Sequence, residues 1–275
     1  MKVDSTMLTT FQTCPSKFFL RFKEGWKPRR ESAPLGFGKA IHAGLAAWYN
    51  THSEIDALMA IDAEWPDNHP MDDYRSKIKC IDVMRAYIKR YPNENFTCKM
   101  IEVPFLLDLG LTTEDGEPIE YGGIFDGLID FAGQIYVLEH KSTSMMGGSY
   151  FNQFRPNNQV SGYVWASQAL SGLRVGGALV NAIGVYAKGE TKFERQIISR
   201  TPDEIEEWKL NVQMVANEIR RAEVTGKWEM RTVNCTMYGK CDYLDVHQLG
   251  HIKERQRLIE QDYVVDHWDF MNQDR

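Results

Sequence analysis

Residues 119–141 have the sequence IEYGGIFDGLIDFAGQIYVLEHK, and this stretch decides the fold. The run from Ile124 to Phe131 is rich in apolar residues, an Ala-Gly-Gln turn signal follows, and Ile135 to Leu138 is β-branched and aromatic. This pattern predicts a β-hairpin. Pairing of the two strands can bring Asp126 and Glu139 to the same end of a sheet.

The hairpin carries residues suited to a divalent metal ion. Side chains alternate along a strand, so Glu139 and Lys141 share one face and His140 points to the other. Asp126 and Glu139 supply hard oxygen ligands for Mg²⁺ or Mn²⁺, to which the His140 backbone carbonyl could be added. Lys141 is placed to orient or deprotonate an attacking water, or to neutralise charge on a phosphate. His42, on a predicted helix, could add an imidazole ligand, which favours Mn²⁺.

Composition sets limits on the class of protein. At 275 residues and 43% hydrophobic, the chain can form one domain or two small ones. No run approaches the roughly 20 apolar residues that span a bilayer, and no signal peptide is evident, so we expect a cytoplasmic protein without membrane association. Five cysteines, an odd number, argue against a disulfide framework. Cys80 and Cys98 lie in helix and strand patterns and are expected to be buried apolar residues.

The net charge of −6 does not indicate a nucleic-acid-binding protein, but the distribution of charge matters more than its sum. Residues 17–39 hold seven basic and two acidic side chains, interleaved with aromatic ones. This basic segment could follow a phosphate backbone, or it could be a solvated face over a small aromatic core. Its candidate DNA-binding residues are Lys17, Arg21, Lys27, Arg29 and Arg30.

Helix and strand patterns predict an α/β protein with a central mixed sheet flanked by helices. The first helix is expected after a cap at Ser5 or Thr6, and the best-marked helix begins with a capping box formed by Thr201 and Glu204. Further expected helices begin near Gly38 or cover residues 53–65, 72–91 and 159–170, and the expected strands cover residues 97–107, 119–131, 135–140, 178–187 and 191–199.

Five short motifs follow one another along the chain: Cys14-Pro15, Gly38 to His42, Gly123 to Asp126, Glu139 to Lys141, and Gln159 to Tyr163. Together they resemble the PD-(D/E)xK nucleases, specifically the branch with the RecB nuclease domain and its CRISPR-associated exonuclease relatives. The resemblance implies a restriction-endonuclease-like α/β core at about residues 36–200, within a single domain of residues 1–275. It implies the following site residues: catalytic Asp126, Glu139, Lys141, Gln159 and Tyr163, and metal ligands His42, Asp126, Glu139 and the His140 carbonyl.

In the resembled family, an N-terminal cysteine joins three C-terminal ones around a [4Fe–4S] cluster. This chain departs from that pattern, because a histidine stands where the last cysteine is expected. Three interpretations compete: an iron–sulfur cluster held by three thiolates and one imidazole, a Cys₃His zinc site, or a vestigial site held by packing alone. A metal would be structural, joining residues 1–35 to residues 225–250. The four candidate ligands are Cys14, Cys235, Cys241 and His247.

The resemblance implies a Mg²⁺- or Mn²⁺-dependent deoxyribonuclease. We expect an exonuclease on single-stranded DNA or duplex ends, acting in recombination or repair in the cytoplasm of a bacterial or phage-infected cell. A recombinase or single-strand annealing protein is the expected partner. The alternatives are a structure-specific endonuclease on the same core and a catalytically silent DNA-binding subunit. The chain keeps Asp126, Glu139 and Lys141 together, which favours an enzyme.

Overall fold

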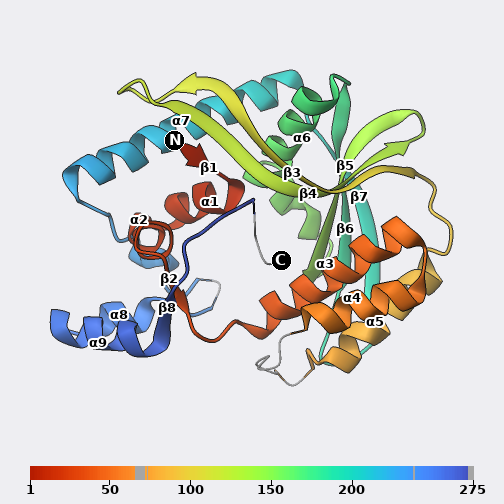
Figure 1. Ribbon diagram of the computed structural model, residues 1–275, viewed down its shortest axis with the longest axis horizontal. Helices are drawn as coiled ribbons and strands as arrows, with labels where there is room; N and C mark the ends of the chain where they lie inside the picture. The colour runs from red at the N-terminus through yellow and green to blue at the C-terminus, as the bar shows by residue number, and fades with distance from the viewer. Residues whose placement is uncertain (66–71, 73, 238, 272–275) are drawn as a thin grey trace. The chain divides into compact units, whose positions relative to one another are not determined.

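Figure 1 shows the computed structural model, which describes residues 1–65, 72, 74–237 and 239–271. The contacts between residues divide the chain into two compact units. The core unit is built from Glu31–Phe105 and Ile124–Ile205, and the terminal unit from Met1–Arg30, Leu106–Gly123 and Glu206–Gln273. The assignment of residues 1–275 to a single domain stays a prediction.

The core unit contains the predicted hairpin within a mixed sheet. Strand β5 (Gln134–Thr143) runs antiparallel to β4 (Pro118–Phe131) and parallel to β6 (Val175–Gly184), and β6 runs antiparallel to β7 (Lys192–Ser199). The residues between β4 and β5, Ala132 and Gly133, have φ angles of 52° and 80°. Positive φ at both positions matches the right-handed strand twist of a tight hairpin. The predicted central mixed sheet is therefore confirmed.

The described residues of the core unit form the α-helices α3 (Ala33–Thr51), α4 (Glu54–Glu64), α5 (Lys77–Arg90) and α6 (Asn158–Ser171). Two predicted helix starts are wrong. Helix α3 begins before Gly38 because Pro34 occupies its first turn, where a missing N–H costs nothing. Helix α5 begins after Ser76, whose side chain accepts from Lys79 N, whereas the Asp72 side chain caps a separate turn; residue 73 lies outside the described residues.

A hydrophobic core forms where α3, α4 and α5 cover one face of the sheet, as Figure 1 shows. Ile41 and Leu45 of α3 belong to this core together with Leu138 of β5, and all three are fully buried. A side chain at Gly44 would come within 2.8 Å of Ile61, so the glycine permits the close approach of α3 and α4. Cys80 is buried in the same core, as predicted, whereas Cys98 is only partly buried and packs against it.

The terminal unit holds the N-terminal segment and the C-terminal segment up to residue 271, the last residue that the structure describes. Strand β1 (Lys2–Val3) pairs in parallel with the first residues of β4, and Asp4, rather than the predicted Ser5 or Thr6, caps α1 by accepting from Met7 N. The capping box of α7 is confirmed, since Thr201 and Glu204 exchange hydrogen bonds. The remaining elements are α1 (Ser5–Thr13), α2 (Pro15–Phe18), η1 (Phe19–Lys23), β2 (Trp26–Pro28), α7 (Pro202–Thr225), η3 (Thr232–Asn234), α8 (Leu244–Gln248), α9 (Ile252–Asp262) and β8 (Tyr263–Val265). Strand β3 (Thr97–Thr112), like β4, runs through both units, and η2 (Tyr150–Phe154) belongs to the core unit.

Within the terminal unit, the C-terminal segment pairs with the N-terminal segment. Strand β8 runs antiparallel to β2, pairing Val265 with Trp26. The ring of Phe270 lies where a side chain at position 122 would be, so only glycine fits there without movement of the ring. In the described part of the chain, no helix combines the length and apolar character that crossing a membrane requires.

Candidate active site

Strand β5 carries a buried acid beside a basic residue. Glu139 is 2% exposed, and the Lys141 ammonium lies 2.7 Å from its Oε1. The other oxygen, Oε2, is buried and has no hydrogen-bond partner among the described residues. A buried acceptor without a partner costs about 1–3 kcal/mol. The carboxylate therefore presents an oxygen that is suited to binding a ligand.

Asp126, on β4, is the second buried acid. It is 4% exposed, and its Oδ2 accepts a 2.7 Å hydrogen bond from the His140 backbone N–H. Its Oδ1 lies 3.2 Å from Nδ1 of His42, which α3 brings to the sheet. The hairpin and α3 thus gather His42, Asp126, Glu139 and Lys141, which the sequence placed in one site.

The charges of these groups are coupled. Burial, and then the nearby charge of Asp126, raise the pKa of Glu139, although the Lys141 ammonium opposes them. Burial lowers the pKa of His42, but the attraction of Asp126 outweighs burial and the net shift is upward. Burial likewise opposes the charge on Lys141, yet the Glu139 carboxylate raises its pKa overall. The two buried carboxylates therefore favour the positively charged forms of His42 and Lys141.

The donor set fits Mg²⁺ or Mn²⁺ by chemistry. Two carboxylates are the hard oxygen ligands that these ions prefer, and the unpartnered Oε2 of Glu139 is an available one. Within the described residues, no three His, Cys, Asp or Glu side chains lie close enough as they stand to hold an ion. Asp126 is bonded to His42 and His140 N, and Glu139 to Lys141. Ligation by His42 and by the His140 carbonyl stays a prediction.

His140 belongs to a polar row across three strands that the sequence reasoning missed. Register places it beside Asn181 of β6, which stands opposite Arg195 of β7. The Asn181 amide donates to His140 Nδ1 at 2.7 Å, and its oxygen accepts from Arg195 Nε at 3.0 Å. Burial lowers the pKa of His140 to about 3, so its ring is neutral at pH 7. A lone asparagine in the apolar run of residues 178–185 was the available signal.

Arg195 is held by a carboxylate and two phenols. Its guanidinium donates to both oxygens of Glu94, at 2.6 and 2.8 Å, and to the hydroxyls of Tyr87 and Tyr49. The Tyr49 ring stacks on the His140 ring, with centroids 5.6 Å apart. Burial opposes the charge on Arg195, but these partners outweigh it and raise its pKa further. The network fixes the orientation of His140, which stands between Glu139 and Lys141 in the sequence.

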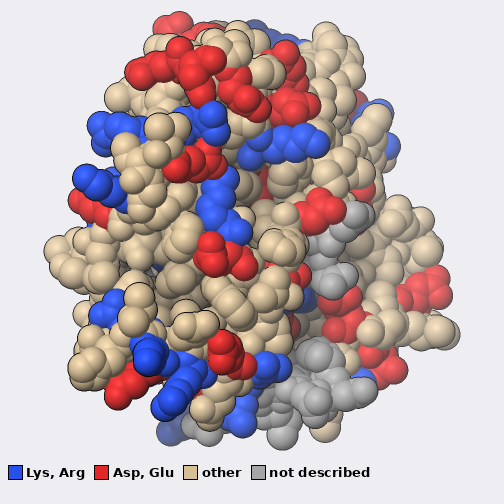
Figure 2. Space-filling view, turned by 60° about the vertical axis from the view of Figure 1, so that its left-hand side comes forward, with Lys and Arg blue, Asp and Glu red and all other residues tan. Residues whose placement is uncertain are grey.

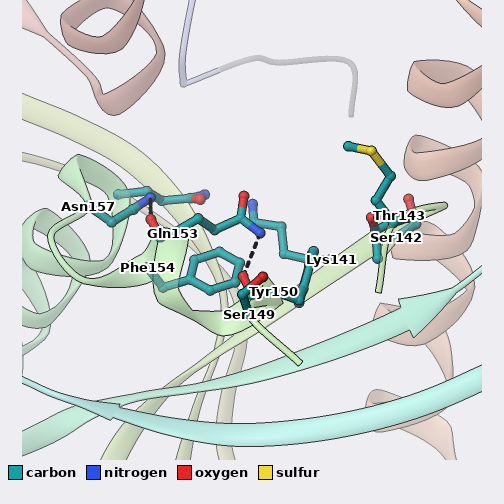
Figure 3. Close-up of a pocket in the computed structure, with 10 residues that line it drawn as sticks. Lys141, Ser142, Thr143, Ser149, Tyr150, Gln153, Phe154 and Asn157 are labelled. Carbon is teal, nitrogen blue, oxygen red and sulfur yellow. Dashed lines mark hydrogen bonds between the residues drawn. The ribbon is translucent and has the colours of Figure 1, made fainter. Parts of the chain in front are cut away.

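A cavity of about 470 Å³ opens beside Lys141. Figure 3 shows side chains of η2 and of the end of β5 around it, and Gln159 of α6 also lines it. Tyr163, one turn further along α6, is instead 6% exposed and packs edge-on against Phe105 and Phe125. Helix α6 thus brings Gln159 to the cavity, whereas the packing of Tyr163 supports the site from within the core unit. Catalytic roles for both stay predictions.

The four candidate ligands of the second metal site lie in one region of the terminal unit. Cys14 Sγ lies 3.9 Å from the carbonyl of Glu229, and the Cys241 backbone N–H donates to the Cys235 carbonyl. His247 Nε2 lies 3.5 Å from the Ser16 hydroxyl, while its buried Nδ1 has no hydrogen-bond partner in the described chain. Among the residues that the structure describes, these four side chains do not lie close enough together to hold a metal ion. The thiols are free, and a cluster stays a prediction.

Most of the candidate DNA-binding side chains in the basic segment already have partners within the protein. Figure 2 shows lysine and arginine side chains interspersed with acidic ones on the face drawn there. Four of the five candidate DNA-binding residues have partners in the terminal unit: Lys17 lies 2.8 Å from Asp242, Arg21 and Lys27 lie near Asp266, and Arg29 donates to the carbonyls of Glu260 and Gln261. Arg30 is exposed. DNA binding by this segment stays a prediction.

Known proteins with similar structures support the fold. A solved structure described as a "putative exonuclease" from Eubacterium rectale aligns with a TM-score of 0.54 and 11% identity, covering 90% of this chain and 88% of that one. At this identity the likeness concerns the fold alone. A second solved structure, SSO0001, aligns with a TM-score of 0.33 and 11% identity over 79% of this chain and 85% of that one, and carries no argument.

No curated protein sequence matches the chain. The family model described as the PD-(D/E)XK nuclease superfamily, however, matches residues 5–246. That range includes both halves of the hairpin and every residue of the candidate active site. The match spans most of the chain, and the protein therefore belongs to the PD-(D/E)XK nuclease superfamily.

Proposed function

We propose that the protein is a Mg²⁺- or Mn²⁺-dependent deoxyribonuclease that acts as an exonuclease on single-stranded DNA or duplex ends. Nucleases of this superfamily generally use one of these two ions. The observation that carries the proposal is the buried Glu139, with one oxygen paired to Lys141 and the other without a partner among the described residues. A purely structural ion pair would not explain why the second oxygen is buried without a partner among those residues.

Asp126 and Glu139 would hold the ion, joined by His42 and the His140 carbonyl. A bound divalent ion supplies an activated water and stabilises charge on the phosphoryl oxygens. Lys141, paired with Glu139, would orient the attacking water or donate to a phosphate oxygen, where its positive charge lowers the energy of the transition state. Gln159 would contact the strand from the cavity wall.

The exonuclease mode is proposed on a different basis from the metal-dependent chemistry. The Eubacterium rectale protein of similar fold is described as an exonuclease, and that description motivates the same mode here. A structure-specific endonuclease uses the same chemistry on the same core. A role in recombination or repair, with a recombinase or annealing protein as partner, rests on analogy with nucleases of this kind.

The test is a digestion time course on single-stranded and duplex DNA, each labelled at the 5′ or 3′ end, with Mn²⁺ and then Mg²⁺. We expect wild-type protein to shorten one labelled end progressively and Lys141→Ala to lose at least about 100-fold in rate, the scale of lost electrostatic stabilisation. Lys192→Ala, which removes an exposed lysine from β7, is the matched control and should cleave normally. Equal digestion by wild type and Lys141→Ala would refute the proposed active site, and internal cuts would favour the endonuclease.

For the second site, the proposal is an iron–sulfur cluster held by Cys14, Cys235, Cys241 and His247, with a structural role. The buried Nδ1 of His247, which has no hydrogen-bond partner among the residues that the structure describes, supports it. Iron and zinc analysis of protein purified without oxygen, with its visible absorption spectrum, tests this: iron with colour that Cys241→Ser abolishes is expected. Stoichiometric zinc would identify a Cys₃His zinc site, and absence of both metals would leave packing alone.

A further inference from the structure

The cavity beside Lys141 has the size and position of a binding site rather than of a packing defect. Its volume, about 470 Å³, lies within the roughly 300–1,000 Å³ typical of small-molecule sites. Lys141 forms part of its wall, so whatever fills the cavity lies next to the residue proposed to act on the phosphate. Figure 3 shows that η2 and the N-terminal end of α6 complete the wall.

The chemistry of the lining suits a nucleobase. Among the described residues around the cavity there is no acidic side chain, and Lys141 is the one charged group. Gln153 and Gln159 offer both donors and acceptors, as the hydrogen-bonding edges of bases require, and Tyr150 and Phe154 offer aromatic surface. A phosphate needs donors and positive charge only, so the acceptor oxygens of the amides and the aromatic rings would add little to its binding.

The wall is held in place before any ligand binds. The Gln153 amide donates to the Tyr150 carbonyl at 2.9 Å, which closes the η2 turn. Buried Arg200 joins this turn to α6 by donating to the Phe154 carbonyl at 2.6 Å and to the Ser161 hydroxyl at 2.8 Å. Such prior organisation reduces the entropy lost on binding.

From these features we propose that the cavity holds one unstacked nucleotide of a single DNA strand, next to the phosphodiester that is cut. The proposal rests on the function proposed above and specifies its substrate: a site for one splayed base cannot accept a base pair, so the strand must be single or its end frayed. Tyr150 stacks on the base, and Gln153 contacts the base edge. Paired bases must first be unpaired at an energetic cost.

The experiment uses the full chain with Mn²⁺ and a series of single strands in which one position at a time lacks its base. We expect the missing base to lower kcat/KM about 10- to 100-fold at one position relative to the cut, the scale of one lost stacking contact. Tyr150→Ala should lower kcat/KM on intact strands by a similar factor and remove the sensitivity to the missing base. Gln153→Met, which keeps the volume, should weaken that sensitivity in part.

Phe151→Ala is the matched control, because Phe151 belongs to the same turn and aromatic cluster but does not line the cavity. It should keep the ratio of intact to abasic cleavage. Equal cleavage of intact and abasic strands at every position would overturn the proposal while leaving the nuclease function intact. If wild type cuts no DNA better than Lys141→Ala, the nuclease function fails instead. Equilibrium binding to the same strands in a chelator then decides the present proposal: tighter binding of intact strands, lost in Tyr150→Ala, supports it, and equal binding refutes it.

Discussion

The pair formed by Arg195 and Glu94 allows a demanding test of how the core unit is stabilised. The two side chains are only 14% and 11% exposed, and both carboxylate oxygens accept from the guanidinium. Removing one member of such a pair leaves a buried charge uncompensated, which costs about 3–5 kcal/mol. We therefore expect Glu94→Gln and Arg195→Met each to lower the free energy of unfolding by about that amount at pH 7.

The double variant distinguishes a coupled pair from two independent contacts. Removing both charges leaves no uncompensated charge, so its cost should fall below the sum of the single costs by about 2–3 kcal/mol. Urea unfolding, followed by far-ultraviolet circular dichroism and tryptophan fluorescence, measures each cost from the transition midpoint, provided the denaturant dependence is unchanged.

A surface pair in the same unit provides the control. Arg85 lies 3.1 Å from Glu54, but their side chains are 56% and 49% exposed. Arg85→Met should cost no more than about 1 kcal/mol. If Arg195→Met costs as little as this control, or if the double variant costs the full sum, the reasoning about buried charge in this network is wrong.

Three further outcomes are expected. Burial raises the pKa of Glu223, but hydrogen bonds from Lys23 and Arg220 outweigh burial and the net shift is downward. These contacts therefore stabilise the fold above the ordinary glutamate pKa, and their contribution is lost as pH falls. Glu223→Gln should lower the free energy of unfolding by up to about 1 kcal/mol at pH 7 and not at all in acid, as measured by urea unfolding across pH. Gly122→Ala should cost about 1–3 kcal/mol through overlap with Phe270, and Phe270→Leu in the same chain should recover part of it in thermal unfolding; additive losses would contradict the overlap. Arg30→Ala should reduce the slope of the logarithm of the DNA-binding constant against the logarithm of salt concentration by about 1, the value of one phosphate contact. An unchanged slope would mean that Arg30 is not part of the DNA interface.

Local sequence signals predicted the elements whose causes are local. The capping box at Thr201 and Glu204 needs only neighbouring residues, and the hairpin after Asp126 follows from one turn and two apolar runs. Some helix starts were misplaced: α3 was expected near Gly38 although Pro34 suits a first turn, and Asp4 took the cap predicted for Ser5 or Thr6.

The sequence predicted which residues the fold would bring together, but not the contacts that hold them in place. The motif order identified Asp126, Glu139 and Lys141, which the fold gathers. The contact between Asn181 and Arg195 could not be predicted, because it depends on the register of strands far apart in sequence. Pairing of β2 with the C-terminal β8 was missed for the same reason.

The polar row of His140, Asn181 and Arg195 has a consequence for folding as well as for the site. Side chains alternate between the two faces of a strand, so sliding β6 by one residue would turn Asn181 to the opposite face. His140 and Arg195 would then be buried without their shared partner, at a cost that purely apolar strands would not incur. Shifting the register of a sheet with only valine, leucine and isoleucine in its interior costs less free energy than shifting a sheet with a buried row of hydrogen-bonded polar side chains. The row thus favours, among the alignments open to these three strands as they assemble, the one in which Glu139 and Lys141 reach the candidate active site.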